Sequence, residues 1–347
     1  MAKKVAIITY HHVVNYGAVL QAYALNRFLR KVGGFSVETI DYRPPKAIEA
    51  YNKALFENNP LEKNNRARAE KIEFFVRNYI PLTDKSFSSQ DQLLEIGSFV
   101  YDSFITGSDE VWNIHGFRGF DTSYFLGFVQ FGHRYSYAAS FGFTESTGQY
   151  RAQISSLLEK FDAISVRDNH SLHIIQEELG LRCVKVLDPT LLLKNYDEII
   201  QIPPERGFIF VYSNCSPEEA DYIRRFAKYL NKPIIAAAYP LEGAENRLEL
   251  SPGEWLGHFA AADYVFNGFF HGVAMSLFFQ KPFTAFAKPD KIKKVGDLLA
   301  DVGLADRIVT DPSPNSSLPS PDVDFKNAIL TLERLNEESR AFLLENL

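Results

Sequence analysis

Short apolar runs alternate along the chain with stretches in which apolar residues recur every three or four positions, and the first such pair opens the sequence. Residues 5–9 form an apolar run, a loop through Gly17 follows, and helical spacing continues to Gly33-Gly34, a common helix end. Residues 35–41 follow and are predicted to form the next strand. The opening therefore predicts a strand, a helix and a second strand.

The same alternation continues through the first half of the chain. The segment 57–68 is polar and is predicted to be irregular and mobile. The other predicted elements are strands at 103–106, 134–138, 163–166 and 183–186, and helices at 146–161 and 169–179.

A second series begins after residues 194–206, where the sequence QIPPERG interrupts any regular pattern and predicts a linker. Ser216 and Pro217 mark a helix start, because serine caps helices and proline is tolerated in the first turn. The second series comprises strands at 208–212, 233–237, 264–266 and 282–286, and helices at 216–230, 271–279 and 322–347.

Strands that alternate with helices predict parallel sheets covered on both faces. The fold class is therefore α/β, with two Rossmann-like domains of mainly parallel sheets at residues 1–195 and 205–320. The amphipathic helix 322–347 is expected to pack back towards the first domain. Ligands of such sheets bind beyond the carboxyl ends of the strands, so we expect an active site in a cleft between the domains.

Composition narrows the function classes. The chain has 347 residues, 46% of them hydrophobic, and a net charge of -6, which argues against nucleic acid as the main partner. The apolar run at the start is too short for a signal peptide and no stretch is long enough to span a membrane, so a cytoplasmic protein is expected. Cys183 and Cys215 stand in no metal-binding pattern, and no metal is expected.

Two polar clusters follow predicted strands of the first domain. In NYGAVLQAYAL, Gly17 begins a helix whose backbone N–H groups would favour an anion, although such a sequence also makes a plain strand-to-helix turn. In FITGSDEVWN, Gly107 lets the backbone approach a ligand, and Ser108 or Asp109 would either hold a ligand hydroxyl or cap a helix. The sequence contains neither GxGxxG nor GxxxxGK[ST], so a dinucleotide fingerprint and a P-loop are not supported.

Two further clusters carry charge or a titratable ring. In ISVRDNHS, Arg167 would pair with a phosphate or carboxylate of a ligand, or else form an ion pair with a residue such as Asp168. In FNGFFHGVAMSLFFQKPF, His271 stands between a strand and a helix beside Gly272, where it could exchange a proton with a bound anion. A single histidine in this position is also compatible with a purely structural role.

Taken in order, these segments resemble the polysaccharide pyruvyl transferase family. The motifs that carry the resemblance span most of the chain: NYGAVLQAYAL, DYRP, TGSDEVWN, YAASFG, ISVRD, VLDPTLLL, FFHGVAMSLFFQKPF and EESRAFL. The resemblance implies a fold like that of two-domain GT-B glycosyltransferases. It also implies phosphoenolpyruvate as co-substrate, with no further cofactor, and a sugar or lipid-linked oligosaccharide as acceptor. Such a precursor would bring the protein close to a membrane surface.

The resemblance also implies roles for individual residues. Arg167 and His271 would be catalytic: Arg167 would bind the phosphate or carboxylate of the donor, and His271 would act as general acid or base on the phosphate side. Asn267 and Gly272 would complete the donor site. The acceptor side would comprise Asn15, Tyr16, Gly17, Gln21, Ser108, Asp109 and Trp112, where the indole either stacks on a sugar ring or packs in the core.

One departure separates the chain from the family pattern. Members commonly carry Thr-Asp-Ser before the Phe-His-Gly, whereas this chain has Asn267-Gly268-Phe269. Two alternatives therefore stand beside pyruvyl transfer. One is a nucleotide-sugar glycosyltransferase, which would use an acid such as Glu242, Glu245 or Glu249 to bind ribose. The other is a non-catalytic protein that binds sugars or anions.

Overall fold

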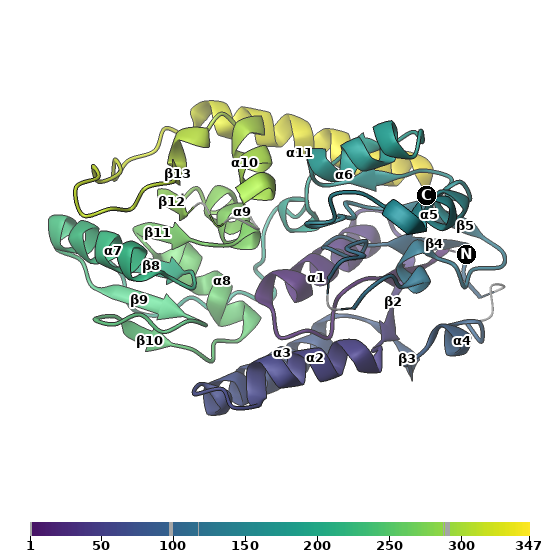
Figure 1. The fold of residues 1–347 in the computed structure, drawn as a ribbon, viewed down its shortest axis with the longest axis horizontal. Helices are drawn as coiled ribbons and strands as arrows, with labels where there is room; N and C mark the ends of the chain where they lie inside the picture. Colours follow the sequence, from purple (N-terminus) through teal and green to yellow (C-terminus); the bar gives the residue numbers. More distant parts are fainter. Residues whose placement is uncertain (1, 97–99, 117, 287, 289–291) are drawn as a thin grey trace. The chain divides into compact units, whose positions relative to one another are not determined.

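The chain folds into two compact α/β units, seen in the computed structural model (Figure 1). The structure describes residues 2–96, 100–116, 118–286, 288 and 292–347. The first unit comprises the chain up to Glu62 together with Glu73–Leu193 and Leu335–Leu347, and the second comprises Lys63–Ile72 and Lys194–Arg334. Two helices, α3 (Glu62–Tyr79) and α11 (Lys326–Asn346), thus supply residues to both units.

The first unit is built on a parallel sheet with the strand order β3-β2-β1-β4-β5. Its central strand β1 is apolar and buried after its first residue, as expected for a strand covered on both faces. A small parallel pair, β6 with β7, continues from β5 through isolated bridges. The strands are β1 Lys4–Ile8, β2 Ser36–Tyr42, β3 Leu82–Phe87, β4 Ser103–Thr106, β5 His133–Ser136, β6 Ser165–Val166 and β7 Val184–Lys185.

The helices of the first unit pack apolar faces against this sheet and against each other. A core of aromatic and aliphatic side chains surrounds the fully buried Trp112. In the C-terminal part of α11, the Ser339 hydroxyl accepts a hydrogen bond from Leu187 N. The remaining helices are α1 Tyr16–Lys31, α2 Pro45–Phe56, α4 Gln90–Leu93, α5 Arg151–Leu158 and α6 Asn169–His173, which continues as a π-helix over Ile174–Glu178.

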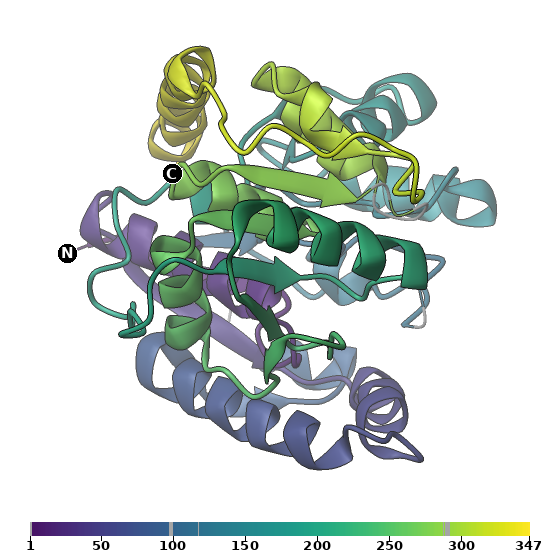
Figure 2. The ribbon, with the colours of Figure 1, turned by 90° about the vertical axis from the view of Figure 1, so that its left-hand side faces the viewer.

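The second unit is built on a longer parallel sheet with the strand order β10-β9-β8-β11-β12-β13. Figure 2 shows α7 running across a face of this sheet, where its apolar side contributes to the core. The strands are β8 Ile209–Tyr212, β9 Ile234–Ala237, β10 Glu245–Arg247, β11 Tyr264–Asn267, β12 Phe283–Phe286 and β13 Ile308–Val309. The helices are α7 Pro217–Leu230, α8 Pro252–Ala261, α9 Phe270–Phe278 and α10 Ile292–Asp301.

The strand orders locate where each unit would bind a ligand. In the first unit the chain moves from β1 outward to β3 and returns on the other side of β1 with β4. In the second it moves from β8 outward to β10 and returns with β11. Such a reversal is a topological switch point, and ligands of open parallel sheets bind beyond the carboxyl ends of the strands that flank it.

An arginine ties residues 63–72 to the rest of the second unit. The Arg68 guanidinium is buried and donates to the carbonyl oxygens of Ala238 (3.1 Å) and Leu248 (3.4 Å). A buried guanidinium needs such acceptors, because an unsatisfied charged donor is costly. This part of α3 therefore packs as an integral part of the second unit.

The α/β class and the parallel sheets are confirmed, and several details of the sequence prediction are wrong. The segment predicted to be irregular at 57–68 contains the start of α3. The helix predicted at 146–161 is limited to α5, because Gly148 has a positive φ of 49° and a 3₁₀ turn precedes the helix. The helix predicted from 322 begins at Lys326.

In the part of the chain that the structure describes, no helix combines the length and the hydrophobicity that a membrane span requires. Cys183 and Cys215 are free thiols. Burial raises the pKa of Cys183 to about 12 and that of Cys215 to about 11, so both stay protonated near neutral pH.

Candidate functional site

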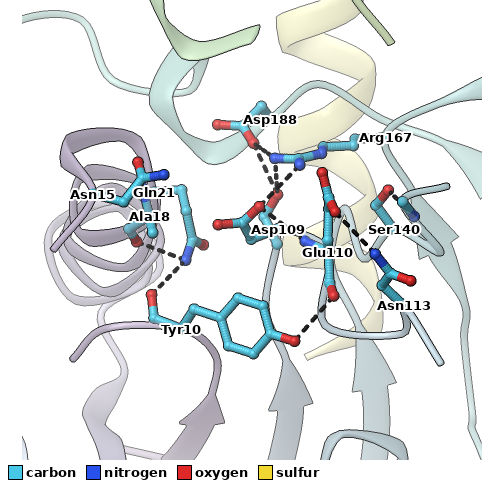
Figure 3. Close-up of polar contacts among 12 residues, drawn as sticks. Tyr10, Asn15, Ala18, Gln21, Asp109, Glu110, Asn113, Ser140, Arg167 and Asp188 are labelled. Carbon is cyan, nitrogen blue, oxygen red and sulfur yellow. Dashed lines mark hydrogen bonds and ion pairs between the residues drawn. The ribbon is translucent and has the colours of Figure 1, made fainter. Parts of the chain in front are cut away.

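In the first unit, three polar segments that are distant in sequence meet around Arg167 (Figure 3). Its Nη1 lies 2.8 Å from Asp188 Oδ2, and its Nη2 lies 3.1 Å from Asp109 Oδ1. The Ser108 hydroxyl donates to the same Asp188 oxygen at 2.8 Å. Burial alone would lower the pKa of the guanidinium, but the charges of Asp109 and Asp188 outweigh burial and raise it. Arg167 is therefore a permanently charged group held between two carboxylates.

Asp109 is the member of this cluster that reaches towards solvent. Its side chain is 16% exposed, whereas those of Arg167 and Asp188 are 2% and 0% exposed. Its φ of 81° is unusual for a residue with a side chain, and such strain is often found at functional sites. Its Oδ1 also accepts from Glu110 N at 2.9 Å. The chain thus holds this carboxylate in one fixed orientation at the carboxyl end of β4.

In the loop after β1 and the start of α1, the predicted acceptor residues cap the helix or are buried. Asn15 is exposed and caps α1, accepting from Ala18 N at 3.2 Å. Gln21 is fully buried, and its Nε2 donates to Thr9 Oγ1 and to the carbonyl oxygens of Tyr10 and Ala18. Tyr16 and Gly17, expected in a ligand-facing loop, are instead buried in the first turn of α1.

Trp112 is a core residue. Its side chain is fully buried, its ring stacks on Phe125 with centroids 5.4 Å apart, and its Nε1 donates to Tyr124 O at 2.8 Å. Of the two alternatives that the sequence left open for this indole, the structure supports packing.

Sequence reasoning missed a cluster of aromatic and charged groups beyond β1 and β2. The Arg118 guanidinium lies 3.4 Å from the centroid of the Tyr10 ring, a cation–π contact. Asp41 is paired with His11 Nε2 at 2.8 Å and Arg43 Nε at 2.6 Å. Burial alone would raise the pKa of Asp41, but the hydrogen bonds from His11 and Arg43 hold it well below its usual range.

His12 is the unusual group in this cluster. Neither of its ring nitrogens has a hydrogen-bond partner among the described residues, and its ring lies edge-on to that of His11. Burial and the nearby charges of His11, Arg118 and Arg43 lower its pKa well below the usual value. The signal in the sequence was the pair of histidines directly after the first strand.

In the second unit, the predicted donor residues gather at the carboxyl end of β11. His271 lies in the first turn of α9 and is 8% exposed. Asn267 ends β11, and its Nδ2 donates to Ser276 Oγ at 2.9 Å. A Cβ on Gly272 would lie only 2.4 Å from Asn267 Oδ1, so a side chain here would displace the Asn267 amide. That oxygen is buried and accepts no hydrogen bond within the described part of the chain.

The residues Asn267-Gly268-Phe269, where the chain departs from the family pattern, fit closely against their neighbours. The Phe269 ring stacks on Tyr239 with centroids 5.3 Å apart and contacts Tyr212 at 5.1 Å. It occupies the N-cap position of α9 but offers no side-chain hydrogen bond there. A Cβ on Gly268 would lie 2.3 Å from Ser213 Oγ, so the neighbouring strand fills the space where a side chain would stand.

Ser213 was also missed at the sequence level. It directly follows β8, which pairs with β11, so it lies at the switch point of the second unit. Ser213 is 3% exposed, and its hydroxyl has no hydrogen-bond partner among the residues described. A polar residue at the end of a predicted apolar strand was the available signal.

The structure thus divides the predicted site residues between the units. Arg167, Ser108 and Asp109 form one connected cluster, although the resemblance assigned Arg167 to the donor and the other two to the acceptor. His271, Gly272 and Asn267 form a second cluster, within the second unit.

Comparison with known families gives one match that covers most of the chain. A family described as polysaccharide pyruvyl transferase matches residues 15–288. No curated protein matches the chain.

Solved structures resemble the whole fold at low sequence identity. A putative UDP-N-acetylglucosamine 2-epimerase from Listeria monocytogenes is 10% identical, with a TM-score of 0.52, over 99% of this chain and 91% of its own. An alpha-glucosyltransferase in complex with UDP-glucose and DNA is 11% identical, with a TM-score of 0.50, over 100% of this chain and 93% of its own. The chain spans 64% of an O-GlcNAc transferase from Thermobaculum terrenum, which is 11% identical with a TM-score of 0.45. The first two likenesses show a GT-B-like fold.

Proposed function

Because this chain belongs to the polysaccharide pyruvyl transferase family and is a transferase, we propose that it moves an enolpyruvyl-derived group from phosphoenolpyruvate to sugar hydroxyls. The acceptor would be a surface polysaccharide or its lipid-linked precursor, and the product a pyruvate ketal. A phosphoenolpyruvate donor would place the reaction in the cytoplasm.

The observation that carries this proposal is the arrangement at the start of α9. His271 and Gly272 lie in the first turn of a helix at the switch point of a parallel sheet. The N-terminus of a helix favours an anion, because its first N–H groups and its dipole both point there. The buried Ser213 hydroxyl, which has no hydrogen-bond partner among the described residues, lies beside Gly268 just before this turn and can donate to an anion. The helix start and this donor together suit a small anion with phosphate and carboxylate groups.

The proposed reaction begins at the enol double bond of the donor and ends with release of phosphate. An acid adds a proton to the methylene carbon of the donor, C2 becomes electrophilic, and one sugar oxygen bonds to it. A second sugar oxygen then bonds to C2 as the C2–O bond to phosphate breaks. The two hydroxyl protons balance the new methyl group and the released hydrogen phosphate. We assign the proton transfer on the phosphate side to His271, because an imidazole can both donate and accept a proton.

For the first unit we propose acceptor binding centred on Asp109. Its partly exposed carboxylate can accept a hydrogen bond from a sugar hydroxyl, and Arg167 holds that carboxylate in place. The resemblance also implies that Arg167 binds the donor directly. Its pairing with two carboxylates favours a positioning role instead.

The test is phosphate release from phosphoenolpyruvate with a panel of sugars that present two neighbouring hydroxyls. The product is checked by NMR for the methyl singlet of a ketal. His271→Ala should lower kcat by about a hundredfold or more, as expected for loss of an acid–base group. His173→Ala, an exposed histidine of the first unit, serves as the matched control. Absence of phosphate release with every acceptor would overturn the proposal.

The same assay with nucleotide sugars tests the glycosyltransferase alternative. Among the acids that could bind ribose, Glu245 pairs with Arg247 at 2.6 Å, and Glu249 accepts from Asn64 Nδ2 at 2.7 Å. Both carboxylates are thus engaged by protein groups. Sugar transfer from a nucleotide donor without consumption of phosphoenolpyruvate would favour that alternative. Anion binding without turnover would favour a non-catalytic protein.

A further inference from the structure

The hydroxyl of Ser213 lies at a place where a buried polar group without a partner is unexpected. It follows β8 at the switch point of the second unit, is 3% exposed, and makes no hydrogen bond within the described residues. Leaving a buried hydroxyl unsatisfied costs about 1–3 kcal/mol, so nearly all such groups in proteins have a partner. A bound ligand would supply one.

The loop that carries Ser213 is fixed from the next strand. Lys288, which follows β12, donates to Asn214 O at 2.9 Å and also pairs with the Glu219 carboxylate. Glu219 in turn accepts from Ser216 N at 2.8 Å in the capping box of α7. The backbone on the C-terminal side of Ser213 is therefore anchored.

Gly268 complements this hydroxyl. A Cβ at position 268 would lie 2.3 Å from Ser213 Oγ and 3.0 Å from its Cβ, closer than packed atoms approach. The hydroxyl of Ser213, which directly follows β8, therefore occupies the space beside Gly268 at the end of β11.

We propose that Ser213 is a donor-binding residue whose hydroxyl donates a hydrogen bond to a phosphate or carboxylate oxygen of the ligand at the start of α9. Gly268 is the matching position that leaves room for it. The identity of the anion as phosphoenolpyruvate rests on the proposed function, whereas anion binding by Ser213 can be tested without turnover. Asn267 Oδ1 can only accept, so it would contact a protonated oxygen of the ligand or a water.

The first experiment is calorimetric titration of the full chain with phosphoenolpyruvate, inorganic phosphate and UDP. Ser213→Ala should weaken phosphoenolpyruvate binding by about tenfold to a hundredfold, the effect of losing a hydrogen bond to a charged group. Asn214→Ala, which changes only the exposed side chain next along the loop, should leave the affinity unchanged. Equal affinity in wild type and Ser213→Ala, or binding of none of the three probes to wild type, would overturn the inference.

A reciprocal exchange tests the pairing of the two positions. Gly268→Ser alone should weaken binding, because its side chain meets Ser213. The double variant Ser213→Gly, Gly268→Ser moves the hydroxyl from one strand to the other and should recover most of the affinity. Thermal unfolding of each variant separates lost binding from lost folding. If the double variant binds no better than Gly268→Ser while remaining folded, the proposed pairing is wrong.

Failure of this inference and failure of the proposed function give different results. Weaker anion binding in Ser213→Ala, with no phosphate release by the wild type, would uphold the role of Ser213 and refute pyruvyl transfer. Phosphate release with an unchanged KM in Ser213→Ala would support pyruvyl transfer and refute the role of Ser213.

Discussion

The two units have the same pair of residue types at their switch points, but the hydrogen bonds of the hydroxyl group differ. In each, a hydroxyl at the end of the first strand faces a glycine at the end of the returning strand: Thr9 with Gly107, and Ser213 with Gly268. Thr9 Oγ1 donates to Ser108 O at 2.8 Å and accepts from Gln21 Nε2 at 2.9 Å. The Ser213 hydroxyl has no such partners among the described residues.

The helices beside these switch points differ in the same way. Asn15 caps α1 through a hydrogen bond from Ala18 N, whereas Phe269 at the start of α9 provides no side-chain cap. The Thr9 hydroxyl is thus engaged by protein groups, whereas the Ser213 hydroxyl has no hydrogen-bond partner among the described residues. If Ser213 binds a ligand as proposed, substitution of Thr9 should affect stability and substitution of Ser213 should affect binding.

The largest effect is expected at Arg167. Arg167→Ala leaves the buried Asp188 carboxylate without its cation, and breaking a buried ion pair in this way typically costs about 3–5 kcal/mol of unfolding free energy. Urea unfolding of the full chain measures this loss. The double variant Arg167→Ala, Asp188→Asn should recover part of it. An unchanged urea midpoint in Arg167→Ala would contradict the structural role of the cluster.

A second effect concerns His12, whose two ring nitrogens have no hydrogen-bond partner among the described residues. Its pKa is lowered in the folded chain, so below a pH of about 6.5 the unfolded chain binds a proton that the folded chain does not. Stability is therefore full above that pH and falls as the pH drops, by at most about 1.4 kcal/mol per pH unit.

His12→Gln should reduce this slope when unfolding midpoints are compared at several pH values between 7.5 and 5.5. A remaining slope is expected from His258 in the second unit, because burial lowers its pKa as well. The same slope in wild type and His12→Gln would show that the imidazole is not kept neutral.

The smallest effect separates the two hydroxyls directly. Thr9→Val should cost about 1 kcal/mol of stability, because Ser108 O and Gln21 Nε2 each lose a partner. Ser213→Ala should cost less, because its hydroxyl has no hydrogen-bond partner among the described residues. Thermal unfolding without ligand measures both changes. A greater loss of stability in Ser213→Ala than in Thr9→Val would reverse the comparison.

Secondary structure was predicted best from the sequence where every residue of an element is buried. The strand at 103–106 was predicted at its observed bounds, because an apolar run between turns has few other structures available. Polar elements were missed: β3, with the sequence LTDKSF, is largely exposed. The helix α8 was missed although Ser251 and Glu254 form a capping box that the sequence displays.

The sequence indicated which segments carry the candidate site residues, but not which of these residues contact one another. Arg167, Asp109 and His271 were identified because they follow strands. The pairing of Arg167 with Asp188 was not foreseen, since 21 positions separate them and only the fold brings them together. Ser213 was missed for a similar reason, because its importance depends on which strand lies beside β8.

The route of the chain also limits how its gene can be divided. Because residues 63–72 fold with the second unit, no continuous stretch of the gene encodes either unit by itself. A cut after Leu193 would leave Ala238 and Leu248 in one fragment and Arg68, which donates to both, in the other. Splitting or recombining this protein therefore requires that the Arg68 segment travel with residues that follow it by more than a hundred positions.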